Sequence, residues 1–476
     1  MLSYTETAFA MQLTSPEYFV LLALVFFLYW FVRRTGKLAV AAVLAANYFF
    51  YATWHPIYLG LVPLAATCDF FLGRAIAGHR PGTARRFFVS LSILLNCSLI
   101  LSSRYVPFLL DPLTAAHPGI AQMEWLLPLS LSFYAFQAMT YTIDIYRGDA
   151  EPAKSILSYL ASVSFFPTII AGPITRVAKL LPQVENNALR LSAEDGGRAL
   201  FLIGLGLMKK LLIADYLGEN LVNRVFDFPK LYSGAETLLA AYGYTFQLYY
   251  DFSGYTDIAL GSALLLGITL PANFNQPYKA INVADFWRRW HISLSNWLRD
   301  YLFFSLPGQR SKWRPYLNLF ITFTIGGLWH GANWTFIVWG ALHGTGLAVV
   351  RGLQALRGKR KPNPGPLLRV VSIVVTFHFV ALTWVFFRAA TIGTALDVLR
   401  QIDSGSVAFT NVTSGFWMVL AIAVLAHYVP GSWYKASLNV FTRMPAPVQA
   451  MALAALVLGI RYVAATGSAP FIYGKF

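Results

Sequence analysis

His330 stands alone among glycine and aromatic residues in one of the most apolar parts of the chain, within the run Gly-Gly-Leu-Trp-His-Gly that begins at Gly326. Residues 316–350 contain no Asp, Glu, Lys or Arg. An ionisable side chain at membrane depth is costly and marks a candidate functional site. A neutral imidazole, with an ordinary pKa of about 6.5, can accept a proton from a hydroxyl near neutral pH. The alternative is a packing histidine that bonds a carbonyl group, with Gly327 and Gly331 letting two helices approach closely.

A second histidine, His291, lies in a segment rich in tryptophan and arginine, residues 285–301. With successive residues turned by about 100°, the large apolar side chains share one arc, whereas Arg288 and Arg289 fall outside it. The arc contains Phe286, Trp287, Trp290, Leu294, Trp297, Leu298 and Tyr301. The pattern predicts one amphipathic helix at the cytoplasmic membrane interface. His291 falls at the edge of the arc, where a catalytic and a structural histidine fit the pattern equally well.

Two further segments place polar residues in apolar surroundings. Asp251 and Asp257 interrupt an apolar stretch, and residues 273–278, Asn-Phe-Asn-Gln-Pro-Tyr, form a polar, aromatic loop. Asp251 either contacts a substrate or pairs with a buried arginine. His343 would lie about 220° around a continuous helix from His330, so we interpret it as a packing residue. The histidine spacing does not match that of metal sites, and no bound metal is expected.

Membrane helices must position these residues, because the composition indicates no other class of protein. The 476 residues are 57% hydrophobic and 12% charged, with a mean hydropathy of +0.55. That is more apolar surface than a soluble core can hide. Stretches near the roughly 20 apolar residues needed to span hydrocarbon recur about thirteen times. We therefore predict an all-α polytopic integral membrane protein of about 11 to 14 transmembrane or re-entrant helices, with interfacial amphipathic helices.

The net charge of +16 is distributed as the positive-inside rule requires, which favours membrane lipids as partners and excludes nucleic acid. Lys and Arg gather at 33–37, 74–86, 285–314 and 351–369, as expected of cytoplasmic loops. Part of this charge can also attract an anionic donor from the cytoplasm.

The same charge pattern constrains the region around His330. With the four basic segments in the cytoplasm, the tail at 465–476 lies outside, and residues 316–350 must enter and leave the membrane on one side. That length is slightly too short for two full spans and a turn. We therefore predict a bent hairpin or a broken, re-entrant pair of helices, with His330 near the bend and deep in the membrane.

Four long motifs, in order along the chain, resemble those of the membrane-bound O-acyltransferase family. They are DFSGYTD from Asp251, NFNQPY from Asn273, FWRRWHISLSNWLRDYL from Phe286 and GGLWHGANWTFIVWGALHG from Gly326. The similarity is closest to the bacterial branch whose membrane subunits serve alginate and peptidoglycan O-acetylation. It suggests three segments: N-terminal transmembrane helices (1–124), a catalytic core (125–390), and C-terminal transmembrane helices with an extracytoplasmic acyl-relay tail (391–476).

The resemblance implies acyl transfer across the bacterial inner membrane. His330 matches the family's catalytic histidine, and His291 matches its partner position. The residues expected to contact substrates are Asp251, Arg288, Arg289, Trp329 and Asn333. The implied donor is acetyl-CoA or another cytoplasmic acyl thioester, with no bound cofactor. The implied acceptor is an extracytoplasmic polysaccharide, reached through a periplasmic SGNH-type acetyltransferase partner.

The final hexapeptide, Phe-Ile-Tyr-Gly-Lys-Phe at 471–476, resembles the aromatic tail found in this branch or on its small partner proteins. The resemblance implies that Tyr473 carries the acyl group transiently. A phenol, with an ordinary pKa of about 10, is a better leaving group than an aliphatic alcohol, so a tyrosyl ester stays activated. The alternative is an aromatic anchor at the membrane surface.

Two other classes of function remain open. A polytopic transporter would explain the many spans and the intramembrane Asp251 and Asp257, although the sequence shows no internal repeat of the kind that transporters often have. A scaffold subunit of an exopolysaccharide export complex would keep its activity when His330 is replaced. The sequence does not identify the acceptor glycan.

Overall fold

The computed structural model describes residues 11–54, 56–114, 130–169, 172–186, 188, 190–358, 365–463 and 472. Within these residues every regular element is a helix and no strand is present, so the predicted all-α fold is confirmed. The helices form two compact units. Unit 1 comprises Met1–Ile203 and Tyr255–Pro271, and unit 2 comprises Gly204–Gly254 and Ala272–Phe476. The functional division at 124 and 390 stays a prediction.

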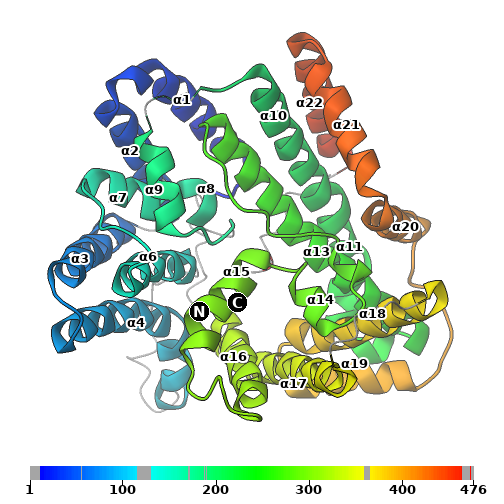
Figure 1. The fold of residues 1–476 in the computed structure, drawn as a ribbon. Helices are drawn as coiled ribbons and strands as arrows, with labels where there is room; N and C mark the ends of the chain where they lie inside the picture. The colour runs from blue at the N-terminus through cyan, green and yellow to red at the C-terminus, as the bar shows by residue number, and fades with distance from the viewer. Residues whose placement is uncertain are drawn as a thin grey trace. The chain divides into compact units, whose positions relative to one another are not determined.

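Unit 1 consists mainly of the N-terminal helices (Figure 1). Their bounds are α1 Pro16–Val32, α2 Lys37–Trp54, α3 Tyr58–Gly78, α4 Thr83–Thr114, α6 Ser130–Arg147, α7 Ile156–Val163, α8 Phe166–Ile169, α9 Val177–Glu185 and α10 Ala193–Leu207, which ends in unit 2. Polar side chains link these helices in pairs. In one such contact, Asp69 of α3 accepts hydrogen bonds from Ser92 and Asn96 of α4, as polar groups commonly do between membrane helices.

Unit 2 contains the second half of the chain and the candidate site. Its helices are α11 Asp215–Leu217, α12 Asn223–Asp227, α13 Gly234–Leu265, whose last part belongs to unit 1, α14 Val283–Trp287, α15 Ile292–Trp297, α16 Arg314–His330, α17 Trp334–Arg357, α18 Pro366–Arg388, α19 Ile392–Asp403, α20 Ser414–Tyr428, α21 Gly431–Arg443 and α22 Ala446–Val463. Three π-helical segments interrupt the regular winding, at Met208–Ala214, Gly218–Val222 and Leu298–Leu302. Such segments are frequent at functional sites.

The described helices include several that are long and apolar enough to cross a membrane, which confirms a polytopic membrane protein. Five qualify singly, namely α1 with the turn after it, α3, α4 up to Ser102, α17 and α18. A sixth arises if α20 and α21, bent by 96° at their junction, form one broken span. The other apolar stretches of the sequence form helices that are shorter or more polar. Residues 156–169, for example, form the short pair α7 and α8.

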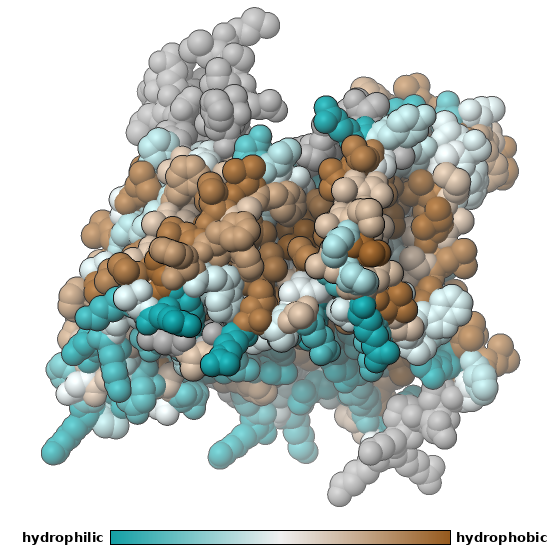
Figure 2. Space-filling view, turned by 90° about the horizontal axis from the view of Figure 1, so that it is seen from above, coloured by the Kyte–Doolittle hydropathy of each residue, from teal (hydrophilic) through white to brown (hydrophobic). Residues whose placement is uncertain are grey.

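Large apolar side chains are exposed along these helices, as lipid contact requires. Phe31 of α1 and Leu356 of α17 are both 87% exposed, and Leu367 of α18 is 79% exposed. Figure 2 shows hydrophobic residues over much of the visible face, with hydrophilic side chains gathered along one border. A soluble monomer rarely presents large contiguous apolar patches, so these exposed side chains fit a surface in contact with lipid.

Candidate active site

His330 is the last residue of α16, at the turn of a helical hairpin. Gly331, Ala332 and Asn333 form the turn, and α17 begins at Trp334. The prediction of a helix pair bent near His330 is therefore confirmed. Asn333 caps α17, because its Oδ1 accepts a bond of 3.0 Å from Thr335 N–H, and its Nδ2 donates to Ala390 O at 2.7 Å. Both ends of this amide stabilise the turn, and its expected contact with substrate stays a prediction.

Glycine residues bring the two helices of this hairpin into backbone contact (Figure 1). A Cβ atom on Gly327 of α16 would overlap the carbonyl oxygen of Phe336 and lie 3.1 Å from its carbonyl carbon. A Cβ atom on Gly340 of α17 would lie 3.0 Å from the carbonyl carbon of Phe323. Because side chains are absent at these two positions, the helices pack against each other through their backbones. The position of His330 is thus set by a rigid backbone contact.

Aromatic rings surround the imidazole of His330. Their centroids lie 4.8 Å away for Trp329, and 5.1 Å away for both Trp339 of α17 and Phe387 of α18. The side chain is buried. An imidazole in such a setting has little water around it, so it can exchange protons with a bound hydroxyl rather than with bulk solvent.

His291 does not lie within a helix, so the prediction of one continuous amphipathic helix over 285–301 is wrong. The α14 helix ends at Trp287, and α15 begins only at Ile292. Between them the backbone of His291 adopts a left-handed conformation with φ 42° and ψ 53°. The cause is a contact distant in sequence, since Ile292 N–H donates to the carbonyl oxygen of Asn273 at 2.9 Å. The predicted apolar arc is nevertheless buried, with Trp297 partly exposed.

The side chain of His291 is enclosed in the interior of unit 2. Its Nδ1 lies 3.3 Å from Asn273 Oδ1. Its ring packs edge-on against Phe252 of α13, at 4.6 Å between centroids, and lies 6.5 Å from the ring of Trp329. Burial lowers the pKa of His291 to about 3, so the imidazole is neutral at physiological pH. Trp329 is thus near both candidate catalytic histidines, since its ring centroid also lies 4.8 Å from that of His330.

His343 of α17 is held by hydrogen bonds at both ring nitrogens. Its Nδ1 accepts from Trp287 Nε1–H at 3.2 Å, and its Nε2 lies 2.9 Å from Thr383 Oγ1. The Thr383 hydroxyl donates to Val380 O, so His343 Nε2 must donate to Thr383. Both nitrogens thus connect α17 to α14 and α18, which supports the interpretation of His343 as a packing residue.

Asp251 of α13 forms a buried ion pair, with a lysine rather than the arginine proposed from the sequence. Lys210 Nζ lies 2.6 Å from Asp251 Oδ1 and 2.7 Å from Asp215 Oδ1. Lys210 belongs to the first π-helical segment of unit 2. Sequence reasoning missed this lysine, although a Lys-Lys pair inside an apolar run at 209–210 is the signal that could have revealed it.

The C-terminal tail reaches the same aspartate. The backbone N–H of Ile472 donates to Asp251 Oδ2 at 3.0 Å, and Ile472 is buried. Tyr473, the expected acyl carrier, lies outside the described residues. Ile472 is therefore held in the interior of unit 2 by Asp251, which directly precedes Phe252, the residue whose ring packs on His291.

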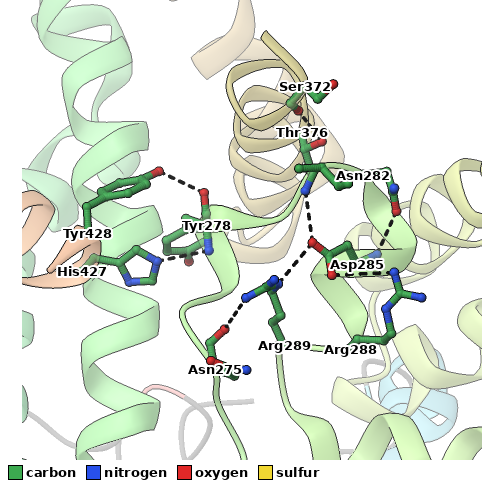
Figure 3. Close-up of polar contacts among 11 residues, drawn as sticks. Asn275, Tyr278, Asn282, Asp285, Arg288, Arg289, Ser372, Thr376, His427 and Tyr428 are labelled. Carbon is green, nitrogen blue, oxygen red and sulfur yellow. Dashed lines mark hydrogen bonds and ion pairs between the residues drawn. The ribbon is translucent and has the colours of Figure 1, made fainter. Parts of the chain in front are cut away.

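Arg288 and Arg289 both pair with Asp285 (Figure 3). Arg289 Nε lies 3.1 Å from Asp285 Oδ2, and its Nη1 donates to Asn275 O. Arg288 is bound more loosely, at 3.6 Å, and its side chain is 68% exposed against 28% for Arg289. Of the two arginines, Arg288 is the more available to an anionic ligand.

The loop 273–278 joins this region to the end of α20. Figure 3 shows Tyr278 beside His427 and Tyr428: its backbone N–H donates to His427 Nε2 at 3.2 Å, and its carbonyl oxygen accepts from Tyr428 Oη at 2.9 Å. Gln276, in a left-handed conformation, donates to the carbonyl oxygens of His427 and Val429. The polar loop predicted from the sequence thus contacts the end of α20 through Gln276 and Tyr278, and the turn at His291 through Asn273. In the described parts of the chain, no group of three or more His, Cys, Asp or Glu residues is arranged to hold a metal ion.

The fold and the site define a polytopic membrane protein whose two candidate catalytic histidines, His291 and His330, are buried among aromatic rings. The model of the MBOAT, membrane-bound O-acyltransferase family, matches residues 153–387. A probable alginate O-acetylase AlgI of Azotobacter vinelandii is 37% identical, covering 84% of this chain and 79% of the relative. A peptidoglycan O-acetyltransferase of Helicobacter pylori is 37% identical, covering 75% of this chain and 72% of the relative. The chain therefore belongs to the membrane-bound O-acyltransferase family, and it is a multi-pass membrane acyltransferase.

Proposed function

We propose that this protein is an O-acetyltransferase subunit of the bacterial inner membrane. It takes acetyl from a cytoplasmic thioester, acetyl-CoA or another acyl carrier, and passes it across the membrane for O-acetylation of an extracytoplasmic polysaccharide. His330 is the general base, His291 its partner, and Tyr473 the transient carrier. The relatives named for alginate and peptidoglycan O-acetylation support acetyl as the group transferred and a polysaccharide as the acceptor. A periplasmic SGNH-type acetyltransferase is the proposed partner.

The observation that carries this proposal is the bond from Ile472 N–H to Asp251 Oδ2. It holds the residue before Tyr473 against α13, where the next residue, Phe252, packs on His291. From His291 a further ring contact leads through Trp329 to His330. Tyr473 is the next residue of the chain after this buried anchor, and we propose that it reaches the two histidines from there.

The proposed chemistry consists of two acyl transfers. In the first, Tyr473 Oη attacks the thioester carbonyl carbon while His330 takes the phenolic proton. The carbon–sulfur bond breaks, and the thiolate leaves with that proton as a free thiol. In the second, a hydroxyl of the acceptor attacks the tyrosyl ester, and its proton restores the phenol. Each step exchanges one acyl bond for another and needs no oxidant or reductant.

A pair of tyrosine variants tests the carrier. Tyr473→Phe keeps the ring but removes the oxygen that is acylated, whereas Tyr462→Phe makes the same change at a residue of α22 that is 90% exposed. We expect the first to abolish polysaccharide acetylation and the second to leave it unchanged. Membranes given donor without acceptor should yield a C-terminal peptide carrying one acetyl group on Tyr473. Full acetylation by Tyr473→Phe would exclude the carrier.

A pair of histidine variants tests the base. His330→Ala should reduce acetyl transfer by about 10²- to 10⁴-fold, the usual effect of removing a general base. His79→Ala removes an exposed histidine at the end of α3 and serves as the control. Expression and insertion of both proteins are compared by immunoblot of the membrane fraction. Normal transfer by a fully inserted His330→Ala variant would favour the scaffold class instead.

A further inference from the structure

Asn273, in the loop between α13 and α14, is buried against the turn that carries His291. Its backbone carbonyl oxygen accepts the Ile292 N–H at 2.9 Å. Its side-chain Oδ1 lies 3.2 Å from Ser293 N, 2.8 Å from Ser293 Oγ and 3.3 Å from His291 Nδ1. One asparagine thus bonds to three consecutive residues of the turn.

Ser293 fixes the orientation of the Asn273 amide. A backbone N–H can only donate, so the side-chain atom that faces Ser293 N must be the oxygen and not the amide nitrogen. If the amide were rotated by half a turn, its NH2 group would face the backbone N–H of Ser293. Two donors cannot form a hydrogen bond, so this contact would be lost. The assignment of Oδ1 therefore follows from the backbone N–H of Ser293, whose hydrogen position is fixed by the peptide plane.

The same oxygen determines which nitrogen of His291 carries the proton. A carbonyl oxygen only accepts hydrogen bonds, so His291 Nδ1 must be the donor in the contact between them. In a neutral imidazole with its hydrogen on Nδ1, the lone pair lies on Nε2. Burial keeps the ring neutral, since it lowers the pKa of His291 to about 3.

We propose that Asn273 is a positioning residue that holds His291 as its Nδ1–H tautomer and thereby makes Nε2 the proton acceptor of this ring in the acyl-transfer site. The left-handed backbone of His291 supports this role. Among the described residues only Gln276 shares a positive φ without being glycine, and such a conformation persists where surrounding bonds hold it. Here the bonds come from Asn273.

The tautomer decides what His291 offers a substrate. With its lone pair on Nε2, His291 accepts a hydrogen bond from a substrate hydroxyl or thiol, whereas the other tautomer would present a competing donor. The catalytic part of this inference rests on the proposed function, in which His291 takes part in acyl transfer. The tautomer itself does not, so the two are tested separately.

The first experiment reads the tautomer directly in the wild-type protein. The enzyme is labelled with ¹⁵N-histidine in lipid bilayers, and the His291 signals are identified by their loss in His291→Asn, a residue that also tolerates a left-handed backbone. We expect a protonated Nδ1 and an unprotonated Nε2 at pH 7. A spectrum with the proton on Nε2 overturns the proposal, whatever the outcome of any activity assay.

The second experiment uses the pH dependence of acyl transfer. Asn273→Asp keeps an acceptor for His291 and Ser293 but adds a negative charge, which favours imidazolium and raises the pKa of His291 by about one to three units. The protonated ring has no lone pair, so the acidic limb of the pH–rate profile should move to higher pH. Asn275→Asp adds the same charge at an exposed position of the same loop and should not move it.

The profiles decide the catalytic part of the inference. A shifted acidic limb for Asn273→Asp, with the Asn275→Asp profile matching wild type, supports it. Superimposable profiles for Asn273→Asp and wild type overturn it. If Asn273→Asp does not insert, the wild-type spectrum still decides the proposed tautomer, since a proton on Nε2 overturns it. If instead His330→Ala retains full transfer, the proposed function fails, while the spectrum still establishes what Asn273 does to His291.

Discussion

Replacing Gly327 by alanine should disable the enzyme, although it adds only one methyl group. That methyl would overlap the carbonyl oxygen of Phe336 and lie 3.1 Å from its carbonyl carbon. Both are backbone atoms of α17 and have no other rotamer to adopt. To restore ordinary contact, α16 and α17 have to separate by roughly 1 Å.

This separation occurs one turn before His330, so the imidazole moves with it. A displacement of about 1 Å at a catalytic group lowers a rate by about 10²-fold. Overpacking of this kind also destabilises a protein by about 1 to 3 kcal/mol. We therefore expect Gly327→Ala to insert into the membrane, to unfold at a lower temperature and to transfer acetyl about a hundredfold more slowly.

Gly326→Ala is the matched control, because it makes the same change in the same helix. Its methyl group would meet only the end of the Leu298 side chain, at 3.3 Å, and a leucine can rotate. Both variants gain helix propensity equally, so the difference between them isolates the backbone contact. The assay measures polysaccharide acetylation in cells, normalised to membrane-inserted protein, with thermal unfolding in detergent. Equal activity of the two variants would refute the argument that backbone contact positions His330.

Three further predictions concern ionisable side chains of unit 2. Lys210→Met leaves buried carboxylates without their cation and should destabilise the protein by about 3 to 5 kcal/mol; adding Asp251→Asn should recover part of this loss in thermal unfolding, and no recovery would show that the pair is not coupled. The pKa of His291 is lower in the folded state than in the unfolded state, where it is about 6.5. As the pH falls from 6.5 towards 3, only the unfolded state therefore binds a proton at this imidazole. The free energy of unfolding should then decrease by about 1.4 kcal/mol per pH unit. The unfolding midpoint of wild type should therefore fall relative to that of His291→Asn between pH 6.5 and 5, and parallel curves would contradict the burial of a neutral ring. Arg288→Glu should raise the apparent KM for an anionic thioester more at low than at high salt, and it is a cleaner test than a change at Arg289, which is bound more tightly to Asp285 and also donates to Asn275 O.

The hairpin at His330 was predictable because two simple quantities define it. The length of the uncharged stretch 316–350 and the positive charge of the loops on either side together require a turn within the membrane. The glycines that bring the helices together are visible in the sequence as well. Local composition and topology therefore suffice where an element is determined by its own residues.

The turn at His291 was not predictable in the same way. Helical periodicity over 285–301 is real, and the predicted apolar side chains are largely buried. The break depends on hydrogen bonds that Asn273, eighteen residues before His291, accepts from the turn, and no pattern within the segment reveals them. Long-range polar contacts override local helix propensity here. The roles of the candidate catalytic residues, Tyr473 among them, stay predictions until the variants are measured.

The buried ion pair has a consequence for how the protein is made. The segment with Lys210 leaves the ribosome well before Asp251 of α13 has been synthesised, so the lysine at first has only one of its two carboxylate partners, Asp215 of the same segment. We therefore expect the segment at 208–222 to wait near the membrane surface until α13 arrives and supplies the second carboxylate. Membrane insertion of this region would then be cooperative, with the segment at 208–222 and α13 entering the lipid together.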